Sequence, residues 1–154
     1  AATVVPIEVK ANSAKKAVDK LLTAFHQAAA DANSKTYFSL LAEDAVYMGT
    51  DATERWSKQE FKSYVKPYFD KGIGWLYVAK QRHVIIDKSK KLAWFDELLD
   101  NNSYGECRGS GVLKLTANGW KIVQYNLTVP MPNDIAKGLV EKIRQYKKDT
   151  VTHE

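Results

Sequence analysis

Four side chains capable of chemistry lie together in one short stretch of the sequence. The stretch Gly49–Trp56 contains the carboxylates of Asp51 and Glu54, the guanidinium of Arg55 and the indole of Trp56. Carboxylates can transfer protons, an arginine can pair with an anionic ligand, and an indole can stack on a ring. Two interpretations stay open. The stretch either lines a ligand pocket, or it is a folded turn in which Asp51 accepts backbone hydrogen bonds and Trp56 packs on the next helix.

Two further carboxylates stand side by side in the segment Leu92–Leu99. Asp96 and Glu97 alternate faces if this segment is a strand, so only one of them can point inward. A carboxylate enclosed by apolar groups has a raised pKa and can act as a general acid or base. With Asp51, these two are the candidate catalytic residues. The alternative is that one of them pairs with Arg108 and the other lies in solvent.

A pair of amides marks the last strand. Gln124 and Asn126 share one face of it with Trp120 and Ile122. Amides are neutral and cannot act as bases, but they can orient a polar ligand. The alternative is that they satisfy each other and nearby backbone groups.

Histidine and cysteine usage predicts neither a metal site nor a cofactor. His26 lies at the edge of a helix face, His83 on a sheet surface and His153 near the end of the chain, without ligand spacing. The single cysteine, Cys107, excludes an internal disulfide and is interpreted as a packing residue. The sequence contains no phosphate-binding loop and no serine nucleophile motif, so we expect no cofactor.

Composition indicates one ordinary globular domain. The 154 residues are 45% hydrophobic and 27% charged, and no apolar run approaches the length of about 20 residues that spans a bilayer. The net charge of +5 is spread along the chain, without the clustered basic and aromatic residues of nucleic-acid modules. We therefore expect neither a nucleic acid nor a membrane as partner. A chain that begins Ala1-Ala2-Thr3 is typical of a secreted or periplasmic protein after signal cleavage, and also of a trimmed chain.

Periodicity predicts helices in the first part of the chain and in its last segment. An extended arm over residues 1–12 precedes a helix from a cap at Asn12 or Ser13 to about Ala32. A short helix begins at Asn33 or Ser34, and a strand follows over 45–48. The spacing of Ser57 and Glu60 is a capping box for a third helix. A final helix begins at Asn133 or Asp134.

Residues 75–129 have the alternation and turn residues of a strand meander. Asn118-Gly119 indicates a type I′ hairpin turn. The predicted strands are 75–87, 92–99, 105–116 and 120–129. Helices followed by such a meander predict an α+β fold, in which a curved antiparallel sheet wraps around the N-terminal helices and a C-terminal helix follows. The open mouth of such a cone is a natural ligand pocket. The cone would span residues 13–130, and residues 131–154 would form the C-terminal helix and tail.

Three stretches carry a resemblance to a known family. Leu41–Tyr47 reads L-A-x-D-A-hydrophobic, Gly49–Trp56 follows it, and the third stretch runs from Gly111 to Leu127. Together they resemble the nuclear transport factor 2-like superfamily, and within it the SnoaL-like domains of a subgroup of unknown function. The resemblance implies a cystatin-like cone, and it implies that the face of Gln124 and Asn126 looks into it.

The resemblance also argues against one activity. Ketosteroid isomerases of this superfamily carry an aspartate base shortly after the A-x-D-A turn and a tyrosine donor in the first helix. A count without gaps places these positions at Gly49 and Phe25, which can supply neither group. We therefore expect no ketosteroid isomerase activity, and whether the chain is an enzyme stays open.

Three hypotheses for function remain. The first is a small-molecule-binding domain, whose ligand-binding residues would be Tyr47, Asp51, Arg55, Trp56, Trp94, Gln124 and Asn126. The second is a cofactor-independent cyclase, dehydratase or isomerase that uses a pocket carboxylate. The third is a non-catalytic dimerisation or partner-binding module. We also expect a homodimer through the outer sheet face, to which Val123, Tyr125 and Leu127 are assigned.

Overall fold

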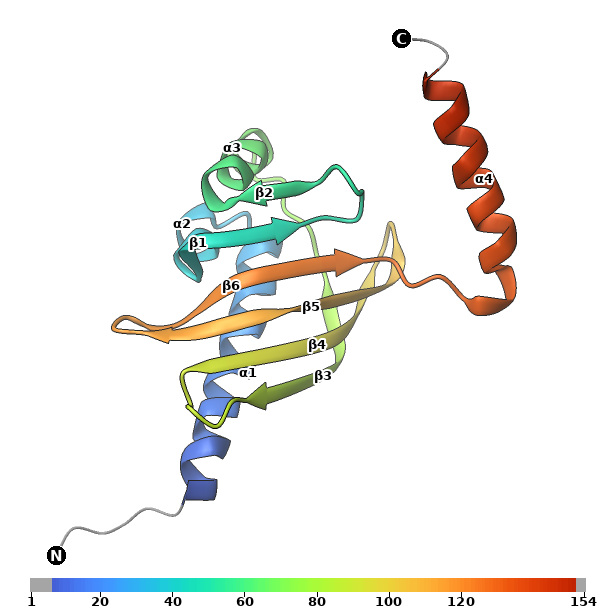
Figure 1. The fold of residues 1–154 in the computed structure, drawn as a ribbon. Coiled ribbons are helices and arrows are strands. Elements are labelled where there is room, and N and C mark those ends of the chain that lie inside the picture. Colours follow the sequence, from blue (N-terminus) through green and yellow to red (C-terminus); the bar gives the residue numbers. More distant parts are fainter. Residues whose placement is uncertain (1–6, 152–154) are drawn as a thin grey trace, which may run out of the picture.

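The chain folds as a curved six-stranded sheet with helices against one face (Figure 1). The computed structural model describes residues 7–151, of which residues 7–11 are described only as helix. The sheet order is β2-β1-β6-β5-β4-β3. The elements are α1 (Ile7–Ala30), α2 (Ser34–Ser39), β1 (Leu41–Met48), β2 (Arg55–Ser57), α3 (Lys58–Phe69), β3 (Val78–Ile86), β4 (Leu92–Asn101), β5 (Gly105–Thr116), β6 (Gly119–Thr128) and α4 (Asn133–Val151).

The predicted fold class is confirmed. The N-terminal helices pack on the concave side of the sheet, and the C-terminal helix α4 follows the last strand (Figure 1). One strand pair differs from a purely antiparallel sheet, because β1 runs parallel to β6. The helices and the meander between β1 and β6 provide the long connection that a parallel pair needs.

The core lies between α1 and the concave side of the sheet. The periodic apolar residues of α1 are buried as expected, among them Val18, Leu22 and Phe25. They face inward-pointing residues of the central strands, such as Phe95 and Leu113. Burial of an amphipathic helix face supplies most of the stability of such a layer.

The N-caps of α2 and α3 are among the residues that the sequence predicts for them. Asn33 accepts a hydrogen bond from the backbone amide of Thr36 at 3.0 Å at the start of α2. Ser57 and Glu60 form the predicted capping box at the start of α3. These local patterns place α3 directly after the Gly49–Trp56 stretch.

Two predicted boundaries and one predicted turn type are wrong. The first strand begins at Leu41 and not at residue 45. The first helix begins at Ile7, so residues 7–12 are not an extended arm, and neither Asn12 nor Ser13 caps it. Residues 1–6 lie outside the described part of the chain. The β5–β6 turn is not type I′, because Gly119 has a φ of +91° but Asn118 does not have a positive φ. A tight turn followed by a left-handed glycine takes its place.

A bulge in β6 reverses the predicted facing of its side chains. Val112 pairs with Gln124 while Leu113 pairs with Ile122, so Val123 is an extra residue. One inserted residue shifts the alternation by one position. Tyr125 and Leu127 are consequently buried on the concave side.

The C-terminal helix stands beside the sheet rather than on it (Figure 1). None of its residues is buried, and Ile135 and Ile143 are each at least half exposed. This amphipathic helix therefore leaves part of its apolar face in solvent. Within residues 7–151, no helix combines the length and the apolar character needed to cross a bilayer.

Candidate functional site

A buried carboxylate, Glu97 of β4, lies at the centre of the concave side. It is 1% exposed. Its Oε1 accepts a hydrogen bond from the Tyr125 hydroxyl at 2.8 Å and lies 2.7 Å from His26 Nε2. Its Oε2 accepts a hydrogen bond from Arg82 Nε at 2.7 Å. Glu97 thereby joins α1, β3, β4 and β6.

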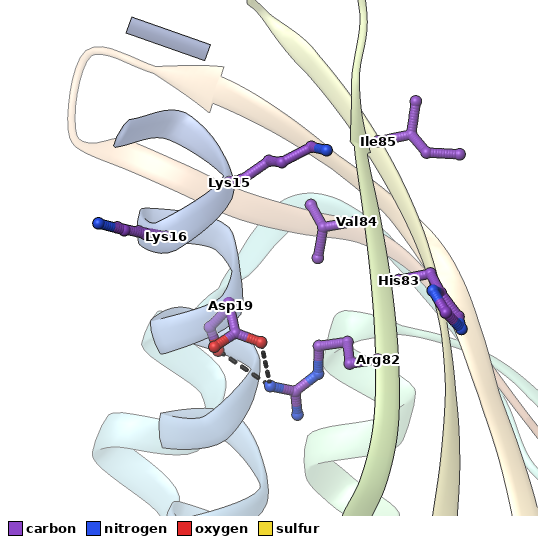
Figure 2. A pocket seen from close by; sticks show the side chains of 7 residues that line it. All are labelled: Lys15, Lys16, Asp19, Arg82, His83, Val84 and Ile85. Atoms are coloured by element: carbon purple, nitrogen blue, oxygen red, sulfur yellow. Dashed lines mark hydrogen bonds and ion pairs between the residues drawn. The ribbon is translucent and has the colours of Figure 1, made fainter. Parts of the chain in front are cut away.

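Arg82 extends this network to α1. Figure 2 shows the guanidinium reaching from β3 to Asp19, where Nη1 lies 2.9 Å from Oδ1. The same nitrogen donates to the Thr23 hydroxyl at 2.9 Å. The Arg82 side chain is 7% exposed, and its buried Nη2 has no partner among the described residues. The largely buried guanidinium of Arg82 therefore forms an ion pair with the buried carboxylate of Glu97.

The charges of the network follow from its geometry. Burial is the largest influence and alone would raise the pKa of Glu97, but hydrogen bonds and charge from His26 and Arg82 together lower it. Burial and the negative charge of Glu97 raise the pKa of Tyr125 well above its ordinary value. Glu97 is thus an ionised carboxylate surrounded by donors, which makes it a poor proton acceptor.

Of the two adjacent carboxylates, Glu97 points inward and Asp96 is exposed on the outer face. The predicted partner Arg108 is wrong, because the partner of Glu97 is Arg82, which is its neighbour across the β3–β4 pair. His26 is part of the network rather than a helix-edge residue. Sequence patterns miss these contacts because the partners are 15 and 71 residues apart.

The open end of the curved sheet holds a cavity of about 200 Å³ with aromatic walls. Its lining comes from β1, the β1–β2 loop, β2, α3 and β6, from the segment before β3 and from the β4–β5 turn. The lining residues are Tyr47, Gly49, Thr50, Glu54, Trp56, Phe61, Tyr64, Trp75, Tyr77, Tyr104 and Leu127.

The rings of this cavity form a continuous stack. Tyr64 stacks on Trp56 with ring centroids 4.6 Å apart, and Trp56 lies 5.5 Å from Phe61. Phe61 stacks on Tyr47 at 3.9 Å, and Tyr47 lies 5.5 Å from Tyr125. The stack therefore connects the cavity wall to the hydroxyl that binds Glu97.

Glu54 supplies the carboxylate of the cavity. A Cβ atom at position 49 would lie 2.1 Å from Glu54 Oε2, so the side chain of Glu54 occupies the space that glycine leaves free. The same oxygen accepts a hydrogen bond from the Asp51 amide at 3.1 Å. Glu54 is partly buried, and no ion pair of it is formed with the described residues. The sequence count that placed an isomerase base at Gly49 could not reveal that the Glu54 side chain occupies the space beside this glycine.

The rest of the stretch forms a turn. Asp51 is exposed and accepts hydrogen bonds from the hydroxyl and the amide of Thr53, at 2.7 and 2.8 Å, which lower its pKa. Arg55 is exposed on β2. Tyr47 and Trp56 line the cavity, whereas Asp51 and Arg55 do not.

Three other predicted ligand-binding residues lie on the wrong face. Trp94 is 44% exposed on the convex side of the sheet. Gln124 is exposed and Asn126 half-buried on that side, because the β6 bulge turns them outward. None of the three lines the aromatic cavity.

A second cavity of about 260 Å³ lies between α1 and β3. His26 and Arg82 line it, and Tyr77 belongs to the walls of both cavities. Burial raises the pKa of Tyr77 to about 12, so its hydroxyl keeps its proton at neutral pH. Among the described residues, no three His, Cys, Asp or Glu side chains gather in a way that could hold a metal ion.

The curved sheet and its covering helices have the nuclear transport factor 2-like, cystatin-like fold. A protein of this class from Pseudomonas putida KT2440, of unknown function, superposes with a TM-score of 0.65 at 14% identity, covering 79% of this chain and 90% of that one. A cystatin-like protein from Novosphingobium aromaticivorans gives 0.64 at 11% identity, over 86% and 92%. A provisionally assigned dehydratase from Streptomyces avermitilis gives 0.65 at 16% identity, over 79% and 99%.

The family follows from the sequence itself. The profile of the SnoaL-like domain matches residues 18–132, which is more than half of the chain. The chain therefore belongs to the SnoaL-like domain family. No curated protein matches the sequence.

The Glu97→Gln substitution should strongly destabilise the fold. It removes the buried partner of Arg82 and leaves only the exposed carboxylate of Asp19 to pair with that cation. Breaking a buried ion pair in this way typically costs about 3–5 kcal/mol. The matched control is Asp96→Asn, since Asp96 is exposed and should change stability by less than about 0.5 kcal/mol. Urea unfolding of both variants measures the difference, and similar values for the two would contradict the structural role of Glu97.

The contribution of Glu97 should also depend on pH in a defined direction. Its pKa in the folded chain lies below the ordinary carboxyl value of 4.5, so the folded state binds fewer protons than the unfolded state. The stabilisation is present above that value and is lost as the pH falls through the folded pKa. The stability difference between the wild type and Glu97→Gln should therefore shrink in acid. A difference that grows below about pH 4.5 would contradict this assignment.

Proposed function

We propose that the protein binds a small, largely apolar molecule in the aromatic cavity at the open end of the sheet. The observation that carries this proposal is the convergence of seven aromatic side chains on one space. Aromatic side chains provide large contact areas for ligands, and binding pockets are mostly apolar with few polar groups. A single carboxylate, Glu54, supplies the charged polar contact.

The size of the cavity limits the ligand. The cavity volume of about 200 Å³ is smaller than the volume of pockets that bind drug-sized molecules, which is about 300 Å³ or more. At about 30 Å³ for each water, the space equals roughly seven water molecules. We infer a ligand with few non-hydrogen atoms, or a larger one that projects into solvent.

A second candidate function is proton transfer on the bound molecule. A dehydratase assignment is attached to the Streptomyces avermitilis neighbour, and such reactions need a base beside the substrate. Glu54 fits this role better than Glu97, because Glu54 lines the cavity and forms no ion pair with the described residues. Asp51 and Asp96 are exposed and lie outside the cavity lining, which argues against them as bases.

We also propose a homodimer through the convex face of the sheet, with a corrected set of residues. Ile85, Trp94 and Val112 are consecutive partners across β3, β4 and β5. Ile85 and Trp94 are each more than 40% exposed. Figure 2 shows that the Ile85 side chain points away from α1, on the other side of β3. An apolar row of this kind in solvent favours association. It replaces the predicted set, in which Tyr125 and Leu127 are buried.

Binding should depend on the rings of the cavity and not on the outer tryptophan. Phenol titrated into the protein should bind with a measurable heat, and Tyr104→Ala should weaken its binding at least about fivefold, since a ring contact contributes about 1 kcal/mol. Tyr104 is 54% exposed, so its removal should leave the fold intact.

Trp94→Ala is the control for this titration, because Trp94 lies on the opposite face. Absence of phenol binding to the wild type at millimolar concentrations would contradict the proposal. Equal losses for Tyr104→Ala and Trp94→Ala would place the binding outside the cavity.

The dimer is tested by sedimentation at micromolar concentration. Trp94→Glu places a charge in the apolar row and should convert the dimer into a monomer, because an unpaired charge is costly at a buried interface. Tyr104→Ala at the cavity should leave the dimer unchanged. A wild-type monomer would contradict the proposal directly.

A further inference from the structure

The aromatic cavity has an unbalanced charge. Among its described lining residues, Glu54 is the only one with a formal charge. The chain as a whole carries 23 lysines and arginines and a net charge of +5, yet none of those in the described part of the chain lines the cavity. The groove between α1 and β3 differs, since Lys15, Lys16 and Arg82 line it together with one carboxylate, Asp19 (Figure 2).

The carboxylate of Glu54 is held in place but incompletely satisfied. Its side chain occupies the space that Gly49 leaves free, and its Oε2 accepts one backbone hydrogen bond, from Asp51. A partly buried carboxylate can accept several hydrogen bonds and is stabilised by a positive partner. No lysine, arginine or histidine among the described residues is that partner.

The surrounding phenols add no positive charge. Burial raises the pKa of both Tyr64 and Tyr77, and the negative charge of Glu54 adds to the shift in each case. Both hydroxyls are therefore neutral at pH 7, and each can donate as well as accept a hydrogen bond. An anionic ligand would meet a carboxylate here without any cation to offset it.

The aromatic rings favour the same sign of ligand charge. The face of an aromatic ring attracts a cation within about 6 Å of its centre. Tyr104 makes no ring contact with another described aromatic residue, so the face of its ring is not covered by stacking. A carboxylate among aromatic rings is the arrangement that recognises alkylated ammonium groups.

We propose that the ligand of this cavity is a small organic cation, an alkylated or quaternary ammonium compound whose positive group lies between Glu54 and the aromatic rings. This inference rests on the proposed binding function and narrows it to one class of ligand. A quaternary ammonium with seven non-hydrogen atoms, such as choline, suits a space equal to roughly seven waters.

The test compares choline with 3,3-dimethylbutan-1-ol, in which a neutral carbon replaces the quaternary nitrogen without a change of shape. Isothermal titration of the wild-type protein should give an affinity for choline at least tenfold higher than for the neutral alcohol. Equal affinities, or a preference for the alcohol, would overturn the cation proposal but would leave small-molecule binding intact. Failure of choline, the alcohol and phenol to bind would overturn the proposed function as well.

Glu54→Gln separates charge from shape. The amide keeps the size of the side chain and an acceptor for the Asp51 amide, so the melting temperature should be unchanged. Choline affinity should fall at least tenfold while that of the alcohol stays the same. Glu141→Gln, on the exposed face of α4, is the matched control for net charge and should alter neither affinity.

An unchanged choline affinity in Glu54→Gln would contradict the proposal. If that variant unfolds, Tyr104→Leu replaces it, because Tyr104 is exposed and Leu removes the π face but keeps apolar bulk. A several-fold loss for choline without a loss for the alcohol is then expected, and equal losses for both would contradict cation recognition by the ring.

Discussion

The fold depends on the buried negative charge of Glu97. Glu97 is almost completely enclosed, and burial of an unpaired carboxylate would be prohibitively costly. Its oxygens are instead contacted by Arg82, Tyr125 and His26, which come from β3, β6 and α1. A Cβ atom at position 109 would lie 2.1 Å from the Tyr125 hydroxyl, so glycine at that position leaves room for the network. The helix layer and the sheet are therefore held in register by one set of charge-assisted contacts.

This constraint reaches the cavity through the stacked rings. The Tyr125 hydroxyl is fixed on Glu97, its ring stacks on Tyr47, and Tyr47 stacks on Phe61. Phe61 in turn contacts Trp56 in the cavity wall. A rigid aromatic wall loses little conformational freedom when a ligand binds, which favours affinity in a small space. The two carboxylates thus have different chemistry: Glu97 is saturated and structural, whereas Glu54 retains capacity for a ligand.

The order of helices and strands and the fold class could be predicted from the sequence, because they depend on local signals. The apolar spacing in α1, the Asn33 cap and the Ser57–Glu60 capping box each act within a few residues, and the structure contains all three. Tyr47 and Trp56, which the sequence suggested as ligand-binding residues, line the aromatic cavity.

The errors concern contacts between distant parts of the chain. A strand alternation cannot reveal where one extra residue interrupts it, so the bulge at Val123 placed Gln124 and Asn126 on the wrong face. Trp94 was misassigned because the sequence does not say which face of β4 is covered. The partner of Glu97 and the place of Glu54 over Gly49 both depend on tertiary packing. The candidate site could therefore be predicted only in part.

The most direct test is the position of a cation in a crystal of the complex. Arsenocholine has the shape of choline, and its arsenic atom scatters anomalously, so a diffraction experiment locates the positive centre without ambiguity. We predict an anomalous peak in the aromatic cavity, beside the carboxylate of Glu54 and about 6 Å or less from the centre of a ring. A peak in the groove between α1 and β3 would contradict the assignment of this cavity as a cation-binding site. A peak at any other place, with none in the cavity, would contradict it as well.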